Sequence, residues 1–260
     1  MSDSNTSAKT SSASKRQADV LLHIKQKGSA TIGELATRFE VSEMTVRRIL
    51  HRLNDLSQVI RTPGGAMAAP GGSMERTFLE RSNKMSAAKN ALGRAAASLV
   101  QDGETIVLDS GTTTQCIARH LAGRSSLVVI TSSLAVLEEL SASTGIQVQL
   151  TGGIYRRISH DLYGSAVTES LEGIYADRVF FGAAALSFHK GAMNFDHEMP
   201  RMMLQAGKQK VLVIDSSKIG IEAVYRFCSI EQCDLILTDN GVKGADLQRL
   251  RKLTKVLVAD

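Results

Sequence analysis

The chain has 260 residues, of which 43% are hydrophobic and 22% charged, a composition that excludes a disordered chain and fits one large domain or two smaller ones. It has no apolar run of about 18 residues, no apolar signal segment at its polar N-terminus, and three cysteines without C-x-x-C spacing. These features exclude a membrane span and a disulfide framework and favour a cytoplasmic protein. The net charge is +5, and residues 1–74 hold 10 Lys and Arg against 6 Asp and Glu, while the other residues hold 21 against 20. A basic module on a nearly neutral body is typical of nucleic-acid contact, although a solvated basic surface explains the charge alone equally well.

The chain is expected to divide into four parts. Residues 1–13 are short and polar, so they are predicted to form a disordered tail. Residues 14–69 show helical patterns that end in a Pro/Gly-rich turn, and residues 70–83 are predicted to be a linker. From residue 84 to residue 260, strand-like and helix-like runs alternate, which predicts a second, larger domain.

Three helices are expected within residues 14–69. The first covers about 14–27, with Gly28 just past its end. The second opens at Thr31, because Glu34 stands three residues later with the spacing of a capping box. Ser42 is a good N-cap for the third helix. The apolar residues of that helix recur at the spacing of a buried stripe, at Val46, Ile49, Leu50 and Leu53.

The third helix has the features of a DNA recognition helix. Its first turn is expected to reach base edges in the major groove, while the basic residues on its outer face hold phosphates. Residues 57–61 and 66–68 flank the turn Thr62-Pro63-Gly64-Gly65, which predicts a β-hairpin wing. The alternative is a generic helical bundle with a solvated basic face. The candidate DNA contacts are Ser42, Glu43, Thr45, Arg47, Arg48, His51, Arg52, Arg61, Gly64 and Gly65.

Residues 16–69 resemble the winged helix-turn-helix of the DeoR family of bacterial sugar-metabolism repressors. The resemblance rests on Arg16, Val20 and Ile24, on Ser42-x-x-Thr45-Val46-Arg47-Arg48, and on Gly64-Gly65-Ala66. Two positions depart from the family pattern, which has an acidic residue in place of Ile49 and a histidine in place of Pro63. Ile49 lies on the apolar stripe, so its departure bears on operator affinity and sequence preference rather than on the fold.

The second domain is predicted to be a doubly wound α/β fold. Its strand-like runs are short, β-branched and nearly continuous, as in a parallel sheet covered on both faces. They are ETIVLD, SLVVIT, IQVQLTGG, DRVFFGAA, KVLVIDSS, DLILTD and KVLVA. The intervening helices are expected at about 84–100, 112–122, 132–142, 197–207 and 244–252.

A turn rich in glycine and hydroxyl groups follows the first of these strands and opens a helix. Such a turn exposes backbone N–H groups at the positive end of the helix dipole, and Ser and Thr hydroxyls add further donors, so it suits a phosphate. The alternative is that these residues only cap the helix. The turn consists of Asp109, Ser110, Gly111, Thr112, Thr113 and Thr114.

Other polar turns are expected to converge on the same crevice, because ligands bind doubly wound sheets at the carboxyl ends of the strands. Lys218 and Arg156 are expected to neutralise a phosphate there, and Asp196 and Glu198 to accept hydrogen bonds from sugar hydroxyls. The remaining candidate residues are Thr131, Ser132, Ser133, Gly152 and Gly153. The six histidines lack metal-ligand spacing, and dinucleotide, P-loop and nucleophile-elbow motifs are missing, so no metal, cofactor or catalytic residue is predicted.

Residues 75–257 resemble the effector domain of the same family, which is similar to ribose-5-phosphate isomerase and the coenzyme A transferases. The matching segments are the 109–114 turn, Thr131-Ser132-Ser133, Thr151-Gly152-Gly153 with Arg156, Phe181-Gly182-Ala183, and Ser216-Ser217-Lys218-x-Gly220. The resemblance implies an effector domain that binds a phosphorylated sugar, with the 109–114 turn as its phosphate loop. Residues 193–200 are less acidic than is usual in the family, which bears on the identity of the effector.

Three hypotheses follow. The first is a repressor of a sugar catabolic operon, controlled by a phosphorylated sugar and bound to double-stranded operator DNA as a homo-oligomer, a dimer or tetramer, without membrane contact. The second is a sugar-phosphate isomerase that uses Lys218 and Glu198 and carries an accessory DNA module. The third is a constitutive DNA-binding protein with a non-functional pocket. DNA titrations with sugar phosphates, together with turnover assays, distinguish the three.

Overall fold

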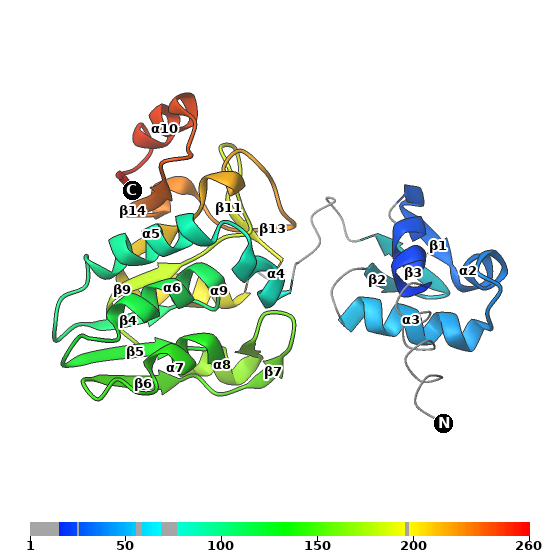
Figure 1. Ribbon diagram of the computed structural model, residues 1–260, viewed down its shortest axis with the longest axis horizontal. Coiled ribbons are helices and arrows are strands. Elements are labelled where there is room, and N and C mark those ends of the chain that lie inside the picture. The colour runs from blue at the N-terminus through cyan, green and yellow to red at the C-terminus, as the bar shows by residue number, and fades with distance from the viewer. Residues whose placement is uncertain (1–15, 25, 56–58, 69–76, 196–197) are drawn as a thin grey trace, which may run out of the picture. The chain divides into compact units, whose positions relative to one another are not determined.

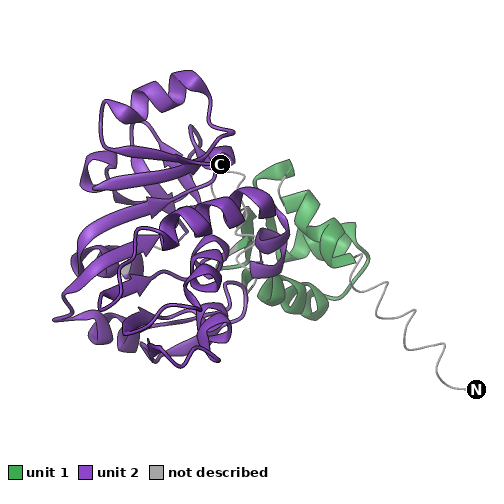
Figure 2. Cartoon of the chain, turned by 60° about the vertical axis from the view of Figure 1, so that its left-hand side comes forward, with its two compact units in different colours: residues 1–75 green, residues 76–260 purple. Residues whose placement is uncertain are grey.

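The computed structural model describes residues 16–24, 26–55, 59–68, 77–195 and 198–260. The chain forms two compact units, residues 1–75 and 76–260, which are coloured separately in Figure 2. The predicted tail of residues 1–13 lies outside the described residues.

The first unit contains the expected helices. Residues 16–24 are helical, and Gly28 follows that helix with φ +85°, its N–H donating to the carbonyl of Ile24 at 2.8 Å. Thr31 and Glu34 form the predicted capping box at the start of the next helix. The two helices that follow are α2 (Ile32–Arg38) and α3 (Glu43–Asp55).

The wing is a three-stranded antiparallel sheet with one strand more than expected. The predicted hairpin is present as β2 (Val59–Thr62) and β3 (Gly65–Ala68), and β1 (Ser29–Thr31) pairs with the other side of β3. A Cβ on Gly65 would lie 2.3 Å from the carbonyl oxygen of Ala30, so the absence of a side chain lets β1 approach β3. Gly64, at φ +99°, turns the chain between the two hairpin strands.

The core of the first unit is the predicted apolar stripe packed against the preceding helices. Val46, Leu50 and Leu53 are at most 1% exposed and Ile49 is 8% exposed. They pack with Val20, Ile24 and Leu35, as predicted from the helical periodicity. Ile49, which replaces the acidic residue of the family pattern, is therefore a core residue, as its place on the apolar stripe indicated.

A seven-stranded parallel sheet forms the centre of the second unit and confirms the predicted doubly wound fold (Figure 1). Its strand order is β15-β14-β12-β9-β4-β5-β6. The order reverses between β4 and β9: the chain builds one half of the sheet outward from β4 to β6 and then returns to pair β9 with the other side of β4. The strands are β4 (Thr105–Leu108), β5 (Leu127–Thr131), β6 (Ile146–Leu150), β9 (Ala176–Phe181), β12 (Gly207–Val213), β14 (Leu235–Asp239) and β15 (Val256–Ala259).

Helices cover both faces of this sheet, as continuous apolar strands require. Three of them pack with Ile106, Leu108 and Phe180 on one face, namely α5 (Ser86–Ala97), α6 (Thr112–Leu121) and α7 (Leu134–Leu140). Three more pack with Val107 and Phe181 on the other, namely α8 (Ser165–Leu171), α9 (Glu198–Gln205) and α10 (Gly244–Arg251). The expected helices therefore lie near their predicted ranges.

Several short elements were not expected from the sequence. Two strands form a separate hairpin, β7 (Ile154–Arg156) and β8 (Asp161–Tyr163). Three more form a small antiparallel sheet, β10 (Ala185–Ser187), β11 (Gly191–Asn194) and β13 (Tyr225–Cys228). Two 3-10 helices are η1 (Ser216–Lys218) and η2 (Ile230–Gln232).

The segment predicted as a linker contains a helix. Within residues 70–83, α4 (Phe78–Asn83) begins at Thr77, whose side chain accepts from the Glu80 N–H while Glu80 accepts from the Thr77 N–H. This capping box satisfies helix-start donors and stabilises a helix in a stretch without apolar periodicity. The boundary between the compact units falls at residues 75 and 76, so α4 belongs to the second unit rather than to a linker.

Candidate functional site

The exposed face of α3 carries the predicted basic residues. Arg47, Arg48, His51 and Arg52 are all exposed, and Thr45 is half-buried beside them. The Ser42 hydroxyl accepts from the Thr45 N–H at 3.3 Å and lies 3.0 Å from the Thr45 hydroxyl, so Ser42 caps the helix as predicted. A helix with one buried and one basic face, and a polar first turn, has the surface that a major-groove recognition helix requires.

Two of the candidate DNA contacts have structural partners nearby. Arg47 lies 3.6 Å from the Glu43 carboxylate, with both side chains more than half exposed, so this pair is weak and open to competition from a phosphate. Arg61 is exposed on the wing, and its backbone N–H donates to the Asn54 side chain at 3.2 Å, which ties the wing to α3. Gly64 and Gly65 shape the turn and the β1 contact described above.

In the second unit, Asp109 joins the two halves of the sheet at the point where the strand order reverses. It follows β4, and its Oδ2 accepts from the Gly182 N–H at 3.1 Å, just after β9. Its Oδ1 accepts from the Ser110 N–H at 2.7 Å. Burial raises the pKa of Asp109, while the two N–H groups oppose that effect. Asp109 therefore lies at the topological switch point, the part of a doubly wound sheet where ligands generally bind.

The first turn of α6 directly follows Asp109 and Ser110 in the chain. Gly111 caps the helix, and Thr112, Thr113 and Thr114 form its first turn, with all three buried. The Thr114 hydroxyl donates to the Asp109 carbonyl at 2.6 Å and accepts from the Gly111 N–H at 2.9 Å. Thr114 therefore braces the loop with its hydroxyl, whereas the N–H groups of a first helical turn have no acceptor within the helix.

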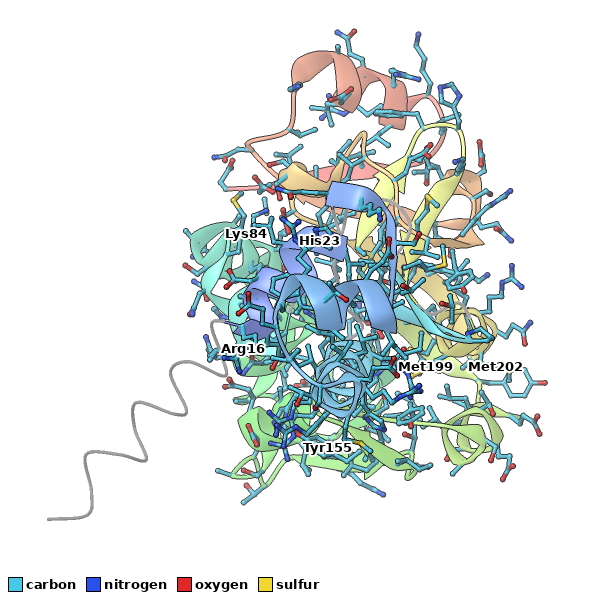
Figure 3. All side chains as sticks on the ribbon, turned by 90° about the vertical axis from the view of Figure 1, so that its right-hand side faces the viewer. Arg16, His23, Lys84, Tyr155, Met199 and Met202 are labelled. Atoms are coloured by element: carbon cyan, nitrogen blue, oxygen red, sulfur yellow. The ribbon has the colours of Figure 1, made fainter. Side chains whose placement is uncertain are left out.

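The turn after β5 also uses its hydroxyls within the protein. Thr131 donates to the Leu108 carbonyl at 2.7 Å, and Ser133 accepts from the Val136 N–H at 3.3 Å as the N-cap of α7. Ser132 donates to the sulfur of Met199 at 3.6 Å, and Figure 3 labels Met199 and Met202 on α9. All three hydroxyl residues are fully buried, so they position the β5 turn and the start of α9.

Arg156 was predicted to neutralise a phosphate, but its guanidinium is bound to a carboxylate. It donates to Asp161 through Nε at 3.0 Å and through a terminal nitrogen at 2.8 Å. The fully buried Asp161 also accepts from the Ser110 hydroxyl at 2.6 Å and from the Ser159 hydroxyl at 2.5 Å. Asp161 is a residue that the sequence analysis did not assign to the crevice, because its hairpin follows no recognisable alternation.

The two glycines after β6 fit the close approach of the β7–β8 hairpin. Gly152 and Gly153 have φ +73° and +117°, which other residues rarely adopt. A Cβ on Gly153 would lie 2.7 Å from the Tyr163 carbonyl, whereas the space beside Gly152 is open. The β7–β8 hairpin therefore requires a glycine at position 153, whereas the space beside Gly152 at the carboxyl end of β6 is unfilled.

Lys218 lies at the carboxyl end of β12, as predicted. It donates to the Ala183 carbonyl at 3.0 Å and is 3.6 Å from the Asp215 carboxylate. A second lysine, Lys89 on α5, is only 3% exposed and donates to the carbonyls of Arg81 and Lys84. Burial lowers the pKa of both lysines, that of Lys89 to about 8, and Lys218 contributes to the shift of Lys89 through charge repulsion.

Lys89 also lines a cleft of about 360 Å³ between α4, α5 and α6. Thr112 of the α6 first turn and Ser82 of α4 lie on its walls. The sequence analysis did not identify Lys89, because a lysine within a helical run carries no signal of burial. Asp196 lies outside the described residues, and only the backbone of Glu198, the first residue of α9, is described.

Neither a metal-binding cluster nor a membrane-spanning helix occurs among the described residues. No group of three or more His, Cys, Asp and Glu among them could hold a metal ion. No helix in that part of the chain is both long and apolar enough to cross a membrane.

Comparison with protein families matches both units. Residues 16–70 match the model of the DeoR-like helix-turn-helix domain, and residues 84–240 match that of the DeoR C terminal sensor domain. A similar protein of Bacillus subtilis, named HTH-type transcriptional repressor GlcR, is 34% identical over 85% of this chain and 86% of its own length. The lactose phosphotransferase system repressor of Lactococcus lactis is 32% identical over 95% of this chain and 98% of its own.

The chain is also similar to a further named repressor and, more distantly, to a solved isomerase structure. The putative aga operon transcriptional repressor of Escherichia coli O157:H7 is 28% identical over 96% of this chain and 95% of its own. Ribose 5-phosphate isomerase A from Methanocaldococcus jannaschii is 18% identical over 50% of this chain and 53% of its own, with a TM-score of 0.38.

Proposed function

Because this chain belongs to the DeoR family of helix-turn-helix transcriptional repressors, we propose that it represses a carbohydrate operon and that a phosphorylated sugar controls its binding to operator DNA. The relatives are named as repressors, so the chain is a regulator and not an enzyme. This excludes the isomerase hypothesis. As a DNA-binding regulator, the protein is proposed to act in the cytoplasm.

The surface of α3 supports the DNA-binding part of this proposal. Its exposed basic residues lie opposite the buried stripe, so the helix can enter a groove without disturbing its core. Arg48, His51 and Arg52 are proposed to contact phosphates or bases, with Ser42, Glu43 and Thr45 near base edges at the first turn. The wing supplies Arg61 beside the helix.

The observation that carries the effector part is a buried lysine, Lys89, which donates to backbone carbonyls and lines one cleft with Thr112 of the α6 first turn. Lys89 donates to neutral carbonyls, Lys218 repels it, and both pKa values lie below the ordinary lysine value. The N-terminal turn of α6 adds positive potential nearby, with Thr112 and Lys89 on one cleft. A phosphate dianion would relieve the repulsion and accept hydrogen bonds from the helix start, whereas a neutral sugar would not.

Asp109, Ser110 and Gly111 are proposed to shape the phosphate loop, with Thr112 and Thr113 contacting the phosphate through their first-turn N–H groups. Thr114, Thr131 and Ser133 are proposed to brace that loop, because their hydroxyls are bonded within the protein. Gly152 leaves room for the sugar at the next strand end. Arg156 is proposed to act indirectly, by orienting Asp161 against the Ser110 hydroxyl.

A dimer or tetramer is proposed as the active form. A single helix-turn-helix reads few bases, and two linked modules gain affinity by binding two half-sites of one operator. An effector then alters DNA affinity by binding one arrangement of the oligomer better than another.

The test is a fluorescence-anisotropy titration of the protein on the DNA upstream of its own gene, with and without a panel of sugar phosphates. We expect tight, salt-sensitive binding that one sugar phosphate changes and that its unphosphorylated sugar does not. Binding that no sugar phosphate changes would favour a constitutive DNA-binding protein with a non-functional pocket. Equal effects of the phosphorylated and free sugar would contradict the anion site.

A further inference from the structure

Helix α4 packs on the rest of the second unit through the Phe78 ring, which lies 5.7 Å from the His160 ring, and through hydrogen bonds at its two ends. It has no buried residue. The ammonium of Lys89 donates to the carbonyls of Arg81 and Lys84, the latter at 2.7 Å, and so caps the end of α4. At the other end, the Phe78 N–H donates to the Ile158 carbonyl at 2.7 Å. An element held by few apolar contacts opens at low free-energy cost, so its position is sensitive to one additional contact.

This helix also forms a wall of the cleft beside the proposed phosphate loop. Ser82 of α4 and Thr112 of α6 line the same 360 Å³ space, with Lys89 between them. Lys84, labelled in Figure 3, directly follows α4. A ligand at the first turn of α6 therefore lies within reach of α4 as well.

Arg81 directs its charge inward from α4. Its Nε and one terminal nitrogen are shielded from solvent although the helix has no buried residue. The guanidinium carbon lies 5.9 Å from the centre of the Phe78 ring on the preceding turn. Burial raises the pKa of Asp109 and lowers the pKa values of Lys218 and Lys89; the positive charge of Arg81 opposes the first effect and adds to the second, so Arg81 lies close enough to act on all three groups.

We propose that Arg81 is a further anion-binding residue of the effector site and that α4 is the element through which a bound anion is sensed. The inference rests on the proposed function. An anion between Arg81 and the first turn of α6 attracts both, so it holds α4 against α6. Helix α4 is the first described element of the second unit after the helix-turn-helix unit in the chain, so it is the part of the effector domain next in sequence to the DNA-binding unit.

The first experiment is hydrogen–deuterium exchange of the full-length protein with inorganic phosphate as the probe, and chloride at equal ionic strength as the control. We expect phosphate to slow exchange of the amides in residues 78–84 as well as in residues 112–115. Slower exchange at 112–115 alone would overturn the role of α4 and leave the proposed anion site standing. No change in either segment would overturn this inference, while the DNA titration would still decide the proposed function.

The second experiment compares Arg81→Gln with Arg251→Gln, a matched change at an exposed arginine of α10. Arg81→Gln is expected to weaken phosphate protection of residues 112–115 by about ten-fold in apparent affinity, as expected for loss of one charge-assisted hydrogen bond. It is also expected to abolish protection of residues 78–84. Arg251→Gln is expected to retain both, and equal behaviour of the two variants would contradict the assignment of Arg81.

A third comparison tests α4 without altering any proposed ligand contact. Thr77→Ala removes the side-chain cap and is expected to speed exchange in α4 about five-fold without ligand, whereas Thr77→Ser retains the hydroxyl and restores the rate. Thr77→Ala is also expected to reduce the effect of phosphate on DNA affinity while leaving affinity without phosphate unchanged. An unaltered phosphate effect, despite faster exchange in α4, would refute the sensing role.

Discussion

Lys89 provides a quantitative test of the charge distribution in the crevice. Its ammonium is almost fully buried, its described acceptors are neutral carbonyls, and its pKa falls from 10.5 to about 8. Because the folded state releases the proton at lower pH than the unfolded chain, the unfolded chain binds more protons between these two pKa values. Stability should therefore rise with pH across this window, and the full difference corresponds to about 3 kcal/mol.

The change to make is Lys89→Met, which keeps the length of the side chain and removes the charge. Between about pH 7.5 and about pH 9.5, Lys89 alone should raise the free energy of unfolding of the wild-type protein by about 2 kcal/mol. The variant should lack this increment. Lys255→Met, at an exposed lysine, is the matched control and should retain it.

The assay is urea unfolding followed by tyrosine fluorescence. All four tyrosines, Tyr155, Tyr163, Tyr175 and Tyr225, lie in the second unit, and the chain has no tryptophan, so the signal reports the unit that contains Lys89. The quantity compared is the pH dependence of the free energy of unfolding in each variant. An equal pH dependence in the Lys89→Met and wild-type proteins would show that Lys89 keeps its charge at ordinary cost and would refute this account of the crevice.

Three other changes test the two units separately. Arg48→Ala should weaken operator binding and reduce the slope of log affinity against log salt by about 0.9, measured by anisotropy over a salt series, whereas Arg251→Ala should leave both unchanged. Thr112→Pro removes one of the first-turn N–H groups proposed to contact the phosphate, and proline is tolerated at the first position of a helix after the extended Gly111. It should leave operator binding without ligand intact and weaken the response to a sugar phosphate; loss of operator binding in the folded variant would contradict the division of labour between the units. Gly65→Ala should destabilise the wing by about 1–3 kcal/mol, because the added Cβ meets the Ala30 carbonyl. Hydrogen exchange in residues 65–68 should then be faster. In the control Gly33→Ala, the added Cβ meets no atom within 4 Å, so exchange in the wing should not change.

The parts of the fold that could be predicted are those with long periodic patterns or paired local signals. The stripe of Val46, Ile49, Leu50 and Leu53 spans two helical turns, and the Thr31 and Glu34 capping box lies within four residues, so each is visible in one short window. The strands of the large sheet are continuous apolar runs because both faces are covered by helices. Their parallel order follows from the alternation with helices.

The elements that could not be predicted depend on partners distant in the sequence or on very short segments. β1 is three residues long and exists as a strand through its pairing with β3, more than thirty residues later. The β7–β8 hairpin has three residues in each strand, too few to show alternation. The capping box of Thr77 and Glu80 at the start of α4 is visible in the sequence. The polar and glycine-rich residues around it nevertheless favoured the prediction of a linker.

The roles of the side chains in the candidate site also depend on partners that are distant in the sequence. The sequence placed hydroxyl-rich turns at the carboxyl ends of the strands, and the structure brings these turns to one edge of the sheet. It did not distinguish hydroxyls that face a ligand from those that hold the turns, because that depends on backbone carbonyls of neighbouring strands. Thr131, for example, bonds to Leu108 on the adjacent strand.

The basic residues of the proposed anion site differ in how firmly a carboxylate already holds them. Arg156 forms a two-bond pair with the buried Asp161, and leaving that carboxylate unpaired would carry a large free-energy cost, so Arg156 is held in place. Lys89 instead donates to carbonyls, and Lys218 lies 3.6 Å from Asp215, longer than either Arg156 contact. These two lysines can therefore turn toward an added anion at lower cost than Arg156. The proposed phosphate contacts therefore lie on Lys89 of α5 and on Lys218 after β12, rather than on the β7–β8 hairpin that carries Arg156.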